Sequence, residues 1–212
     1  MRRTLLRDTA YQAIRDAIVR GDFPPGSVVS NAVVAGELGL SRAPVRDALA
    51  RLAGEGLVET KPQSYTRVTQ VVPKEVRDAA AVVGAMHELA TRTAVPRLTA
   101  ADVEAMRAAN RRFGAATGAG DVDAALDSDD ELHGVLVGSC GNRAVAATIE
   151  RYTPLIRRLE RRQFSSARAQ RSVRWHDGLI AACAVGDVEA AIDVTAQIWR
   201  SLEDLADDLS AR

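Results

Sequence analysis

Hydrophobic positions recur at helical spacing along the first part of the chain. Between Thr4 and Arg20 they fall mostly on one face, which predicts an amphipathic helix that stops at the Gly- and Pro-rich segment 21–26. A second, short helix follows, which Ser30 or Asn31 can cap. Its predicted buried positions are Val33, Val34 and Leu38, and Gly39 marks its C-terminal end.

A third helix is predicted to begin after Ser41 and to run to about Glu55. Pro44 falls in its first turn, where a missing backbone donor does no harm. Arg42 and Arg46 lie on the polar face of this helix. The opposite, apolar face carries Val45, Ala48, Leu49 and Leu52.

Two short runs of β-forming residues follow Gly56. They cover residues 57–60 and 66–69 and flank a connection at 61–65, which predicts a hairpin. Two helices joined by a tight turn and followed by a hairpin form a winged helix-turn-helix.

After Pro73 the β-type residues become rare, and alanine-rich helical patterns continue to the end of the chain. Pro, Gly, Asn and Asp clusters divide this part into six or seven helices, with predicted breaks near 96–99, 118–121, 139–142, 163–166 and 186–187. The fold class is therefore predicted to be mainly α, with a winged helix-turn-helix domain over residues 1–72 and an all-α bundle over 73–212.

The uneven distribution of charge supports a division into two domains. The formal net charge of the chain is +0, yet residues 1–72 hold ten Lys and Arg against seven Asp and Glu, so the two parts carry about +3 and −3. This asymmetry is expected of a DNA-binding module joined to an acidic partner domain. Ordinary fluctuation explains it equally well in a chain of this size.

The amino-acid composition limits which classes of protein this chain can belong to. A hydrophobic fraction of 47% with 26% charged residues is typical of a globular protein with a real core. The sequence contains neither an apolar run of roughly 20 residues nor a secretory signal, so we expect the protein to stay in the cytoplasm. Cys140 and Cys183 lack the close Cys or His neighbours of a zinc or redox motif and are predicted to be buried, reduced thiols.

The start of the third helix carries the chemistry of a DNA reader. Arg42 and Arg46 are four residues apart and point the same way, and each guanidinium can contact a guanine or a phosphate. The Ser41 hydroxyl and the free backbone donors of the helix N-terminus favour a phosphate there. Two arginines on an exposed helix face are, taken alone, more often simply solvated charges.

The segment that contains these residues resembles the winged helix of the GntR family over roughly residues 5–70. The resemblance rests on Pro25-Gly26, on Leu38-Gly39-Leu40-Ser41-Arg42-Ala43-Pro44-Val45-Arg46-Asp47-Ala48-Leu49, and on Glu55-Gly56-Leu57-Val58. It implies DNA contact by the first turn of the third helix. The predicted DNA-binding residues are Ser41, Arg42, Ala43, Arg46, Lys61 and Arg67, the last two as phosphate contacts from the wing.

The chain departs from the family pattern at contact positions. Asn31 stands where the family commonly has an acidic residue, Ala43 where it commonly has Thr, and Tyr65 near the wing tip where it commonly has Gly. These departures predict a different operator sequence and leave open whether the wing enters the minor groove.

A second candidate site lies in the predicted helical bundle. Asp129 and His133 are spaced i, i+4 and share a helix face, so both can ligate one divalent ion, and His176 offers a further nitrogen from a later helix. Taken alone, this pattern is more often a surface acidic patch beside a chance histidine.

The surrounding residues resemble the FCD sensor domain of the FadR subfamily. The resemblance rests on Asp129 and His133 followed by Ser139-Cys140-Gly141-Asn142, and on Trp175-His176-Asp177-Gly178-Leu179-Ile180 with Gly186-Asp187-Val188-Glu189-Ala190-Ala191. It implies a metal held by one Asp and three His, with a small organic-acid effector beside or upon it. Asp129, His133 and His176 match three of the four ligands.

Two family residues are replaced. The fourth ligand position falls at Ile198, and an arginine often found four residues before Glu88 is Gly84. Three ligands with water can still hold zinc or a similar ion, Gln197 can turn inward, or Ile198 can line a metal-free pocket. The predicted effector-pocket residues are Gly84, Glu88, Asn142, Gln197 and Ile198.

Other candidate side chains have plain structural interpretations. His87 can in principle replace the lost ligand, but a lone histidine among apolar neighbours is more often structural, and we leave it out of the predicted site. Trp175, Trp199 and Tyr152 can wall a pocket, although aromatic residues at such positions are more often core.

Together these patterns predict a transcription regulator and not an enzyme. We expect a homodimer that binds a palindromic DNA operator and a repressor that a small carboxylic acid releases. One alternative is a DNA-binding regulator whose sensor domain is degenerate and binds no metal or ligand. A less favoured one is a metal-dependent hydrolase, for which the sequence offers no nucleophile elbow, phosphate loop or HExxH motif.

Overall fold

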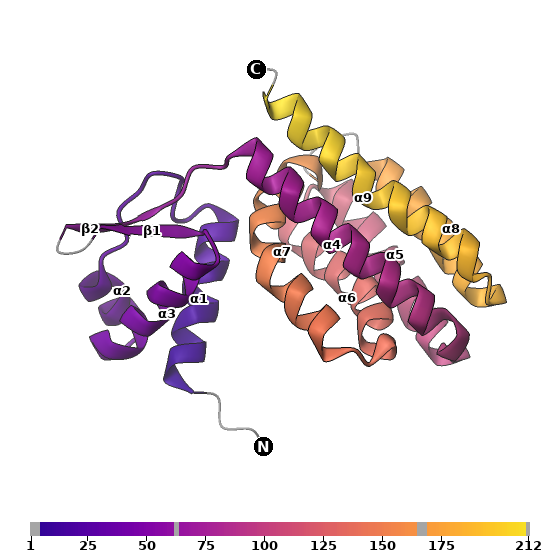
Figure 1. Ribbon diagram of the computed structural model, residues 1–212, viewed down its shortest axis with the longest axis horizontal. Coiled ribbons are helices and arrows are strands. Elements are labelled where there is room, and N and C mark those ends of the chain that lie inside the picture. Colours follow the sequence, from indigo (N-terminus) through magenta and orange to yellow (C-terminus); the bar gives the residue numbers. More distant parts are fainter. Residues whose placement is uncertain (1–4, 62–63, 165–168, 211–212) are drawn as a thin grey trace. The chain divides into compact units, whose positions relative to one another are not determined.

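The computed structural model describes residues 5–61, 64–164 and 169–210 (Figure 1). These residues form helices and one two-stranded sheet, so the predicted mainly α fold class is confirmed. The chain divides into two compact units, Met1–Val72 and Pro73–Arg212. In the described ranges, no helix combines the length and the apolar character needed to cross a membrane.

The first unit contains three helices, α1 (Leu6–Arg20), α2 (Asn31–Glu37) and α3 (Arg42–Gly54). Helix α1 ends at Gly21, whose φ of 90° is the left-handed conformation that glycine tolerates. Ser30 caps α2 by accepting a hydrogen bond from the backbone N–H of Val33 at 3.4 Å. These boundaries agree with the sequence pattern within two residues.

The burial prediction for α2 was wrong at Val33, and Leu38 is only half-buried. The Val33 side chain is 57% exposed, whereas Val34 and Ala35 are buried. A helix of seven residues packs on α3 along a narrow face, and Val33 lies outside it.

The hairpin consists of β1 (Val58–Lys61) and β2 (Tyr65–Val68), which pair antiparallel with Val58 opposite Val68. The segment after α1 lies along β2, because the Val29 N–H donates to the Thr66 carbonyl at 2.8 Å. The large, fully buried side chains of this unit are Tyr11, Ile14, Leu52 and Leu57.

The second unit is all helical, and its described residues hold six α-helices, as predicted. They are α4 (Pro73–Ala94), α5 (Ala100–Ala119), α6 (Val122–Cys140), α7 (Arg143–Phe164), α8 (Ala169–Val185) and α9 (Val188–Ser210), with a short 3-10 turn, η1 (Val95–Arg97), after α4.

Local signals mark the ends of these helices. Thr99 and Asp102 form a capping box at the start of α5, and the Asp121 side chain caps α6. The side chain of Asn142 accepts a hydrogen bond from the Ala144 N–H at 3.0 Å at the start of α7. The predicted break at 163–166 lies partly outside the described residues.

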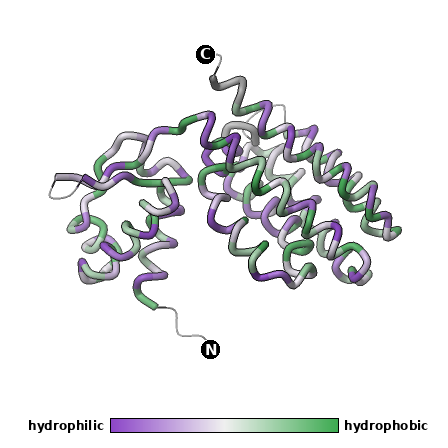
Figure 2. The backbone as a smooth tube through the Cα atoms, in the orientation of Figure 1, coloured by the Kyte–Doolittle hydropathy of each residue, from purple (hydrophilic) through white to green (hydrophobic). Residues whose placement is uncertain are grey.

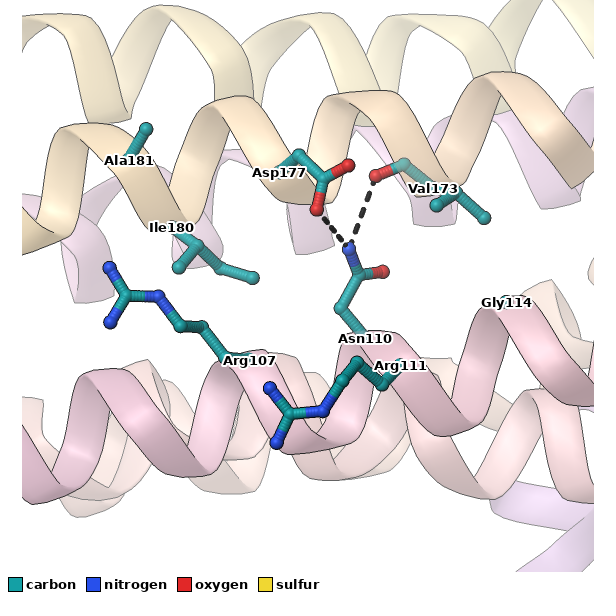
Figure 3. Close-up of a pocket in the computed structure, with 8 residues that line it drawn as sticks. All are labelled: Arg107, Asn110, Arg111, Gly114, Val173, Asp177, Ile180 and Ala181. Carbon is teal, nitrogen blue, oxygen red and sulfur yellow. Dashed lines mark hydrogen bonds between the residues drawn. The ribbon is translucent and has the colours of Figure 1, made fainter.

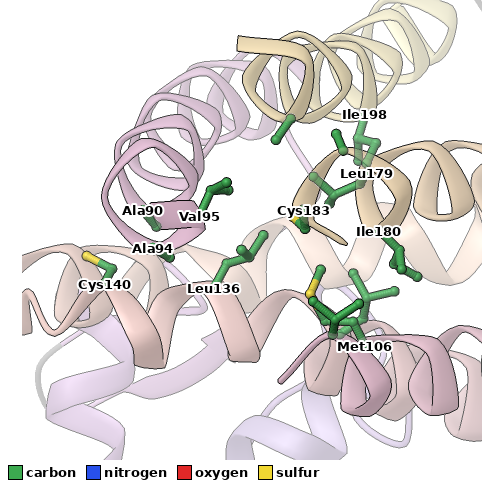
Figure 4. Packing of buried hydrophobic residues seen from close by; sticks show 14 of the residues in the cluster. Ala90, Ala94, Val95, Met106, Leu136, Cys140, Leu179, Ile180, Cys183 and Ile198 are labelled. Carbon is green, nitrogen blue, oxygen red and sulfur yellow. The ribbon is translucent and has the colours of Figure 1, made fainter. Parts of the chain in front are cut away.

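The bundle packs around α4, which contacts α6, α7 and α9, while α5 contacts α6 and α8. Apolar positions gather on the inward faces of these helices (Figure 2). The main hydrophobic cluster includes Ile198, Leu179 and both cysteines, Cys140 and Cys183, which are buried and free as predicted (Figure 4).

A smaller hydrophobic cluster joins α4, α7 and α9 around Trp199. Gly84 of α4 lies against this indole, because a Cβ added at position 84 would lie 3.0 Å from Cβ of Trp199 and 3.2 Å from its Cγ. The large ring therefore occupies the space beside a residue without a side chain.

Candidate nucleic-acid interface and candidate metal centre

The N-terminal turn of α3 presents its polar side chains to solvent. Ser41 is the N-cap residue, and its side chain makes no cap hydrogen bond. Arg42 and Ala43 are exposed. The Arg46 side chain is 73% exposed and has Asp47 within 3.7 Å. A surface ion pair of this kind is weak, so the guanidinium can exchange it for another anion.

A groove of about 630 Å³ runs beside α3 and the hairpin. Arg42, Arg46 and Lys61 all line it, so the structure brings these three predicted residues together. Arg67 is not part of the lining: its guanidinium lies 4.2 Å from the ring centroid of Tyr65 and 3.9 Å from a carboxylate oxygen of Glu59.

Further residues that the sequence did not single out as contacts also line this groove, among them Asn31 and Tyr65. The Oδ1 atom of Asn31 is buried and has no hydrogen-bond partner in the described part of the chain. Their positions were visible in the sequence as departures from the family pattern, but only the packing of the hairpin on α2 and α3 places them in one surface.

The candidate metal centre lies inside the helical bundle. Asp129 and His133 of α6 and His176 of α8 each offer one ligand atom, and these atoms lie within 4.8 Å of one another. Oδ1 of Asp129 is 3.4 Å from Nε2 of His176 and 3.8 Å from Nε2 of His133. All three residues are buried, so this is not the surface acidic patch that was the alternative.

Burial keeps both imidazoles neutral. It lowers the pKa of His176 to about 4 and also lowers the pKa of His133. Burial alone would raise the pKa of Asp129, but the adjacent His133 and Arg157 outweigh it and the pKa is lowered. A carboxylate and two neutral imidazoles are the protonation states that ligate a divalent ion.

Arg157 of α7 holds the Asp129 carboxylate from the other side. Its Nη1 donates to Oδ2 of Asp129 at 3.1 Å and to Oε2 of Glu160 at 2.6 Å, and its Nη2 donates to Asp130. Burial alone would lower the pKa of Arg157, but its three carboxylate partners raise it. Because Arg157 takes Oδ2, the other oxygen of Asp129 is the one that faces the two imidazoles.

A cavity of about 130 Å³ adjoins this centre. Asp129, His133, Arg157 and Trp199 line it, together with His87, which sequence reasoning had set aside. Three buried polar atoms around it have no hydrogen-bond partner in the described ranges: Nδ1 of His133, Nε of Arg157 and Nε1 of Trp199. Buried polar atoms without partners are rare in native proteins, and these three belong to residues that line one small cavity.

The predicted effector-pocket residues do not line this cavity. Asn142 and Gln197 are exposed, so Gln197 does not turn inward as a ligand. Ile198 belongs to the main hydrophobic cluster, Glu88 is half-buried, and Gly84 touches the cavity only through Trp199.

The other two aromatic candidates pack against the cores. Trp175 packs against the main hydrophobic cluster and Tyr152 against the cluster around Trp199.

The donor set fits a divalent ion such as zinc. One carboxylate oxygen and two imidazole nitrogens are ligands of the kind found in zinc sites that keep a fourth position open. Three buried polar atoms without partners among the described residues belong to side chains that line the adjoining cavity.

Comparison with known proteins assigns both units. The model for bacterial regulatory proteins of the gntR family matches residues 6–68, and the model for the FCD domain matches residues 78–201. The chain belongs to the GntR family. The combination is the architecture of its FadR-like subfamily, which confirms the predicted resemblance, and the protein is a DNA-binding transcription regulator.

Several characterised and uncharacterised regulators are similar in sequence. An uncharacterized HTH-type transcriptional regulator of Agrobacterium vitis is 33% identical over 131 residues, which cover 60% of this chain and 77% of that protein. A probable D-xylose utilization operon transcriptional repressor of Paenarthrobacter nicotinovorans is 36% identical, over 42% of each protein. The transcriptional repressor RspR of Escherichia coli is 25% identical over 73% of this chain and 68% of its own length.

Solved structures share the fold. McbR/YncC of E. coli has a TM-score of 0.87 at 18% identity, and the match covers 98% of this chain and all of that one, 100%. Lar of Listeria monocytogenes has a TM-score of 0.63 at 17% identity, over 99% of this chain and 100% of its own. The relatives found by sequence are named as transcriptional regulators or repressors.

Proposed function

We propose that the protein is a repressor whose helical unit binds one divalent ion and a small oxygen-bearing effector, and whose winged unit leaves its operator when the effector binds. The observation that carries this proposal is the buried centre of Asp129, His133 and His176 beside a cavity with unpartnered polar atoms. Relatives named as repressors support the direction of regulation.

The effector class follows from the donors around the cavity. Nε of Arg157 and Nε1 of Trp199 are N–H donors without partners, so they favour a ligand with acceptor oxygens, such as a small carboxylic acid. The cavity of about 130 Å³ limits this ligand to a few heavy atoms.

The charge of the site makes effector binding depend on the divalent ion. The carboxylates of Asp129 and Asp130 share the single guanidinium of Arg157, so the empty site has no spare positive charge with which to hold an anion. A bound divalent ion supplies compensating positive charge and open coordination positions for oxygen. We therefore expect the ion and a carboxylate effector to bind cooperatively.

The DNA contacts follow from the groove beside α3. We propose that Arg42 and Arg46 read base edges and that Ser41 and Ala43 lie against the DNA at the same turn. Lys61 contacts a phosphate. Arg67 supports the hairpin through Tyr65 and reaches a phosphate only if it leaves Glu59.

Regulation requires two copies of the chain. We propose a homodimer, formed through residues 73–212, whose paired α3 helices read a palindromic operator. Effector binding changes operator affinity only if it favours one arrangement of the dimer, and DNA then changes effector affinity by the same factor.

The test combines metal content with operator binding. An operator is selected from random duplexes with purified protein, and its affinity is measured for metal-free and zinc-loaded protein with acetate, lactate and malonate. We expect wild type to bind one zinc ion per chain and to lose operator affinity only with zinc and a carboxylate together. Asp129→Ala should lose both properties, whereas the matched control Asp193→Ala, on the exposed side of α9, should keep them.

Three outcomes contradict the proposal in different ways. If wild type binds no stoichiometric zinc, the proposed metal centre is contradicted and a degenerate sensor domain is favoured. If zinc binds but no carboxylate changes operator affinity, the proposed effector class is contradicted. If no duplex is selected, the proposed DNA interface is contradicted.

A further inference from the structure

Asn110 of α5 connects the candidate metal centre to the surface of the bundle. It is 4% exposed, and all its side-chain hydrogen bonds go to α8. Its amide nitrogen donates to Oδ1 of Asp177 at 2.7 Å and to the carbonyl of Val173 at 3.3 Å (Figure 3). Its Oδ1 lies 3.1 Å from Nδ1 of His176.

The two acceptors on α8 decide which way the amide points. A carboxylate and a carbonyl cannot donate, so the NH₂ group of Asn110 must face Asp177 and Val173. The carbonyl oxygen of the amide is then left for His176. Because that oxygen only accepts, Nδ1 of His176 must carry the hydrogen and donate it.

The tautomer decides which ring nitrogen can ligate a metal. A neutral imidazole carries one hydrogen, so a protonated Nδ1 leaves the lone pair on Nε2. Nε2 of His176 is the atom that lies 3.4 Å from Oδ1 of Asp129. The hydrogen-bond chain from Asp177 through Asn110 therefore directs the lone pair of His176 into the centre.

We propose that Asn110 is a positioning residue that, together with Asp177, selects the Nδ1–H tautomer of His176 and so determines the divalent-ion affinity of the site. The inference rests on the proposed metal binding. Partners of metal-ligating histidines typically contribute about 10- to 100-fold to metal affinity. Neither residue stood out in the sequence, because a lone Asn on one helix and an Asp on another have no spacing relation.

The position of the pair makes the proposal testable. Asn110 and Asp177 line an open groove of about 470 Å³ between α5 and α8, while His176 behind them is 1% exposed. Figure 3 shows Asn110 directed from α5 across this groove toward α8. Substitutions at the groove side can thus alter the hydrogen-bond chain without removing a ligand.

Three variants separate positioning from general stability. Asn110→Leu removes the acceptor at similar volume. The double variant Asn110→Asp with Asp177→Asn exchanges carboxylate and amide. The oxygen at position 110 still accepts from His176 and the amide at 177 donates to it, while the longer hydrogen bond to the Val173 carbonyl is lost. Thr195→Val is the matched control, because it removes a buried hydroxyl that lies 3.2 Å from that of Thr91 and takes no part in the hydrogen-bond chain to His176.

Two measurements are made on the full chain. Zinc affinity is measured by competition with a chelating dye, and the tautomer of His176 is read by ¹⁵N NMR in metal-free protein. We expect Asn110→Leu to bind zinc about 10- to 100-fold more weakly, whereas the double variant and Thr195→Val stay within about threefold of wild type. We expect the Nδ1–H tautomer in wild type and in the double variant, and its loss in Asn110→Leu.

The results discriminate between the two proposals. An Nε2–H tautomer of His176 in wild type, which needs no variant to observe, overturns the positioning role. The positioning role is also overturned if Asn110→Leu binds zinc as tightly as wild type does. It is likewise overturned if the double variant binds zinc as weakly as Asn110→Leu does. If wild type shows the expected tautomer but binds no divalent ion, the proposed metal site fails while the tautomer selection by Asn110 stands.

Discussion

The two units use arginine in opposite ways. In the winged unit the Arg46 side chain is 73% exposed, with one nearby carboxylate on its own helix. In the helical unit the Arg157 side chain is only 9% exposed and is held by three carboxylates from α6 and α7. An exposed guanidinium with a weak neighbour remains available to an outside anion, whereas a buried one is committed to the protein itself.

This difference has an energetic consequence. Exposed ion pairs contribute about 0–1 kcal/mol, but removing one partner of a buried pair leaves an uncompensated charge and costs about 3–5 kcal/mol. Substituting an arginine is therefore expected to change the binding of an outside anion in one unit and the stability of the fold in the other. Four predictions test that contrast, in order of expected effect.

The largest effect is expected for Arg157→Leu. The Asp129 carboxylate is then buried without its guanidinium partner and Glu160 loses its hydrogen-bond donor, so the free energy of unfolding should fall by about 3–5 kcal/mol. Urea denaturation of metal-free protein measures it. The matched control Arg46→Leu should change stability by less than about 0.5 kcal/mol, and equal effects of the two variants would remove the contrast.

The second prediction concerns the pH dependence of stability. Burial raises the pKa of Glu160 from 4.5 to about 7, so the folded state holds a proton that the unfolded chain releases. The contribution of Glu160 is present below pH 4.5 and is lost as pH rises through 7. Glu160→Gln should therefore flatten the stability profile in this window by as much as about 3 kcal/mol, measured by urea denaturation at each pH. A profile with unchanged slope would show that Glu160 ionises normally.

In the winged unit, Arg46→Ala should weaken operator binding by about 1–3 kcal/mol if this side chain reads a guanine. Fluorescence anisotropy at matched salt measures the affinity. Arg174→Ala, an exposed arginine of α8, serves as the control and should bind as wild type. Operator affinity unchanged by Arg46→Ala would mean that α3 is not the recognition helix.

The smallest effect is expected for Lys61→Ala. A phosphate contact carries no sequence information, so binding to operator and to unrelated duplex should weaken together, and the slope of log affinity against log salt should decrease by about 1. Lys74→Ala, at the other lysine of the chain, is the control. A loss confined to the operator would instead assign Lys61 to base reading.

Local patterns predicted the fold well because local chemistry determines the element ends. Pro44 and the glycines at the ends of α1 and α2 mark boundaries that any packing must respect. The exposure of Val33 could not be predicted in this way, because it depends on which face of α2 meets α3.

The candidate metal centre was predictable only in part. Asp129 and His133 share a helix, so their spacing brings them together, and the family resemblance added His176. Arg157 and Asn110 reach the centre from α7 and α5, and no sequence spacing connects them with it.

Three consecutive residues near the predicted fourth-ligand position of α9 have different surroundings. Successive helix positions point about 100° apart, so neighbouring residues lie on different faces of the helix. Gln197 is exposed, Ile198 faces the main hydrophobic cluster, and Trp199 lines the cavity. The family interval led to Ile198, but the neighbouring indole is the side chain that faces the cavity.

The contact between Gly84 and Trp199 couples the side chains that these two positions can hold. A methyl group at 84 would lie 3.0 Å from Cβ of Trp199, so a longer side chain there requires the indole to shift or to be replaced by a smaller residue. Positions 84 and 199 are therefore expected to vary together in homologues.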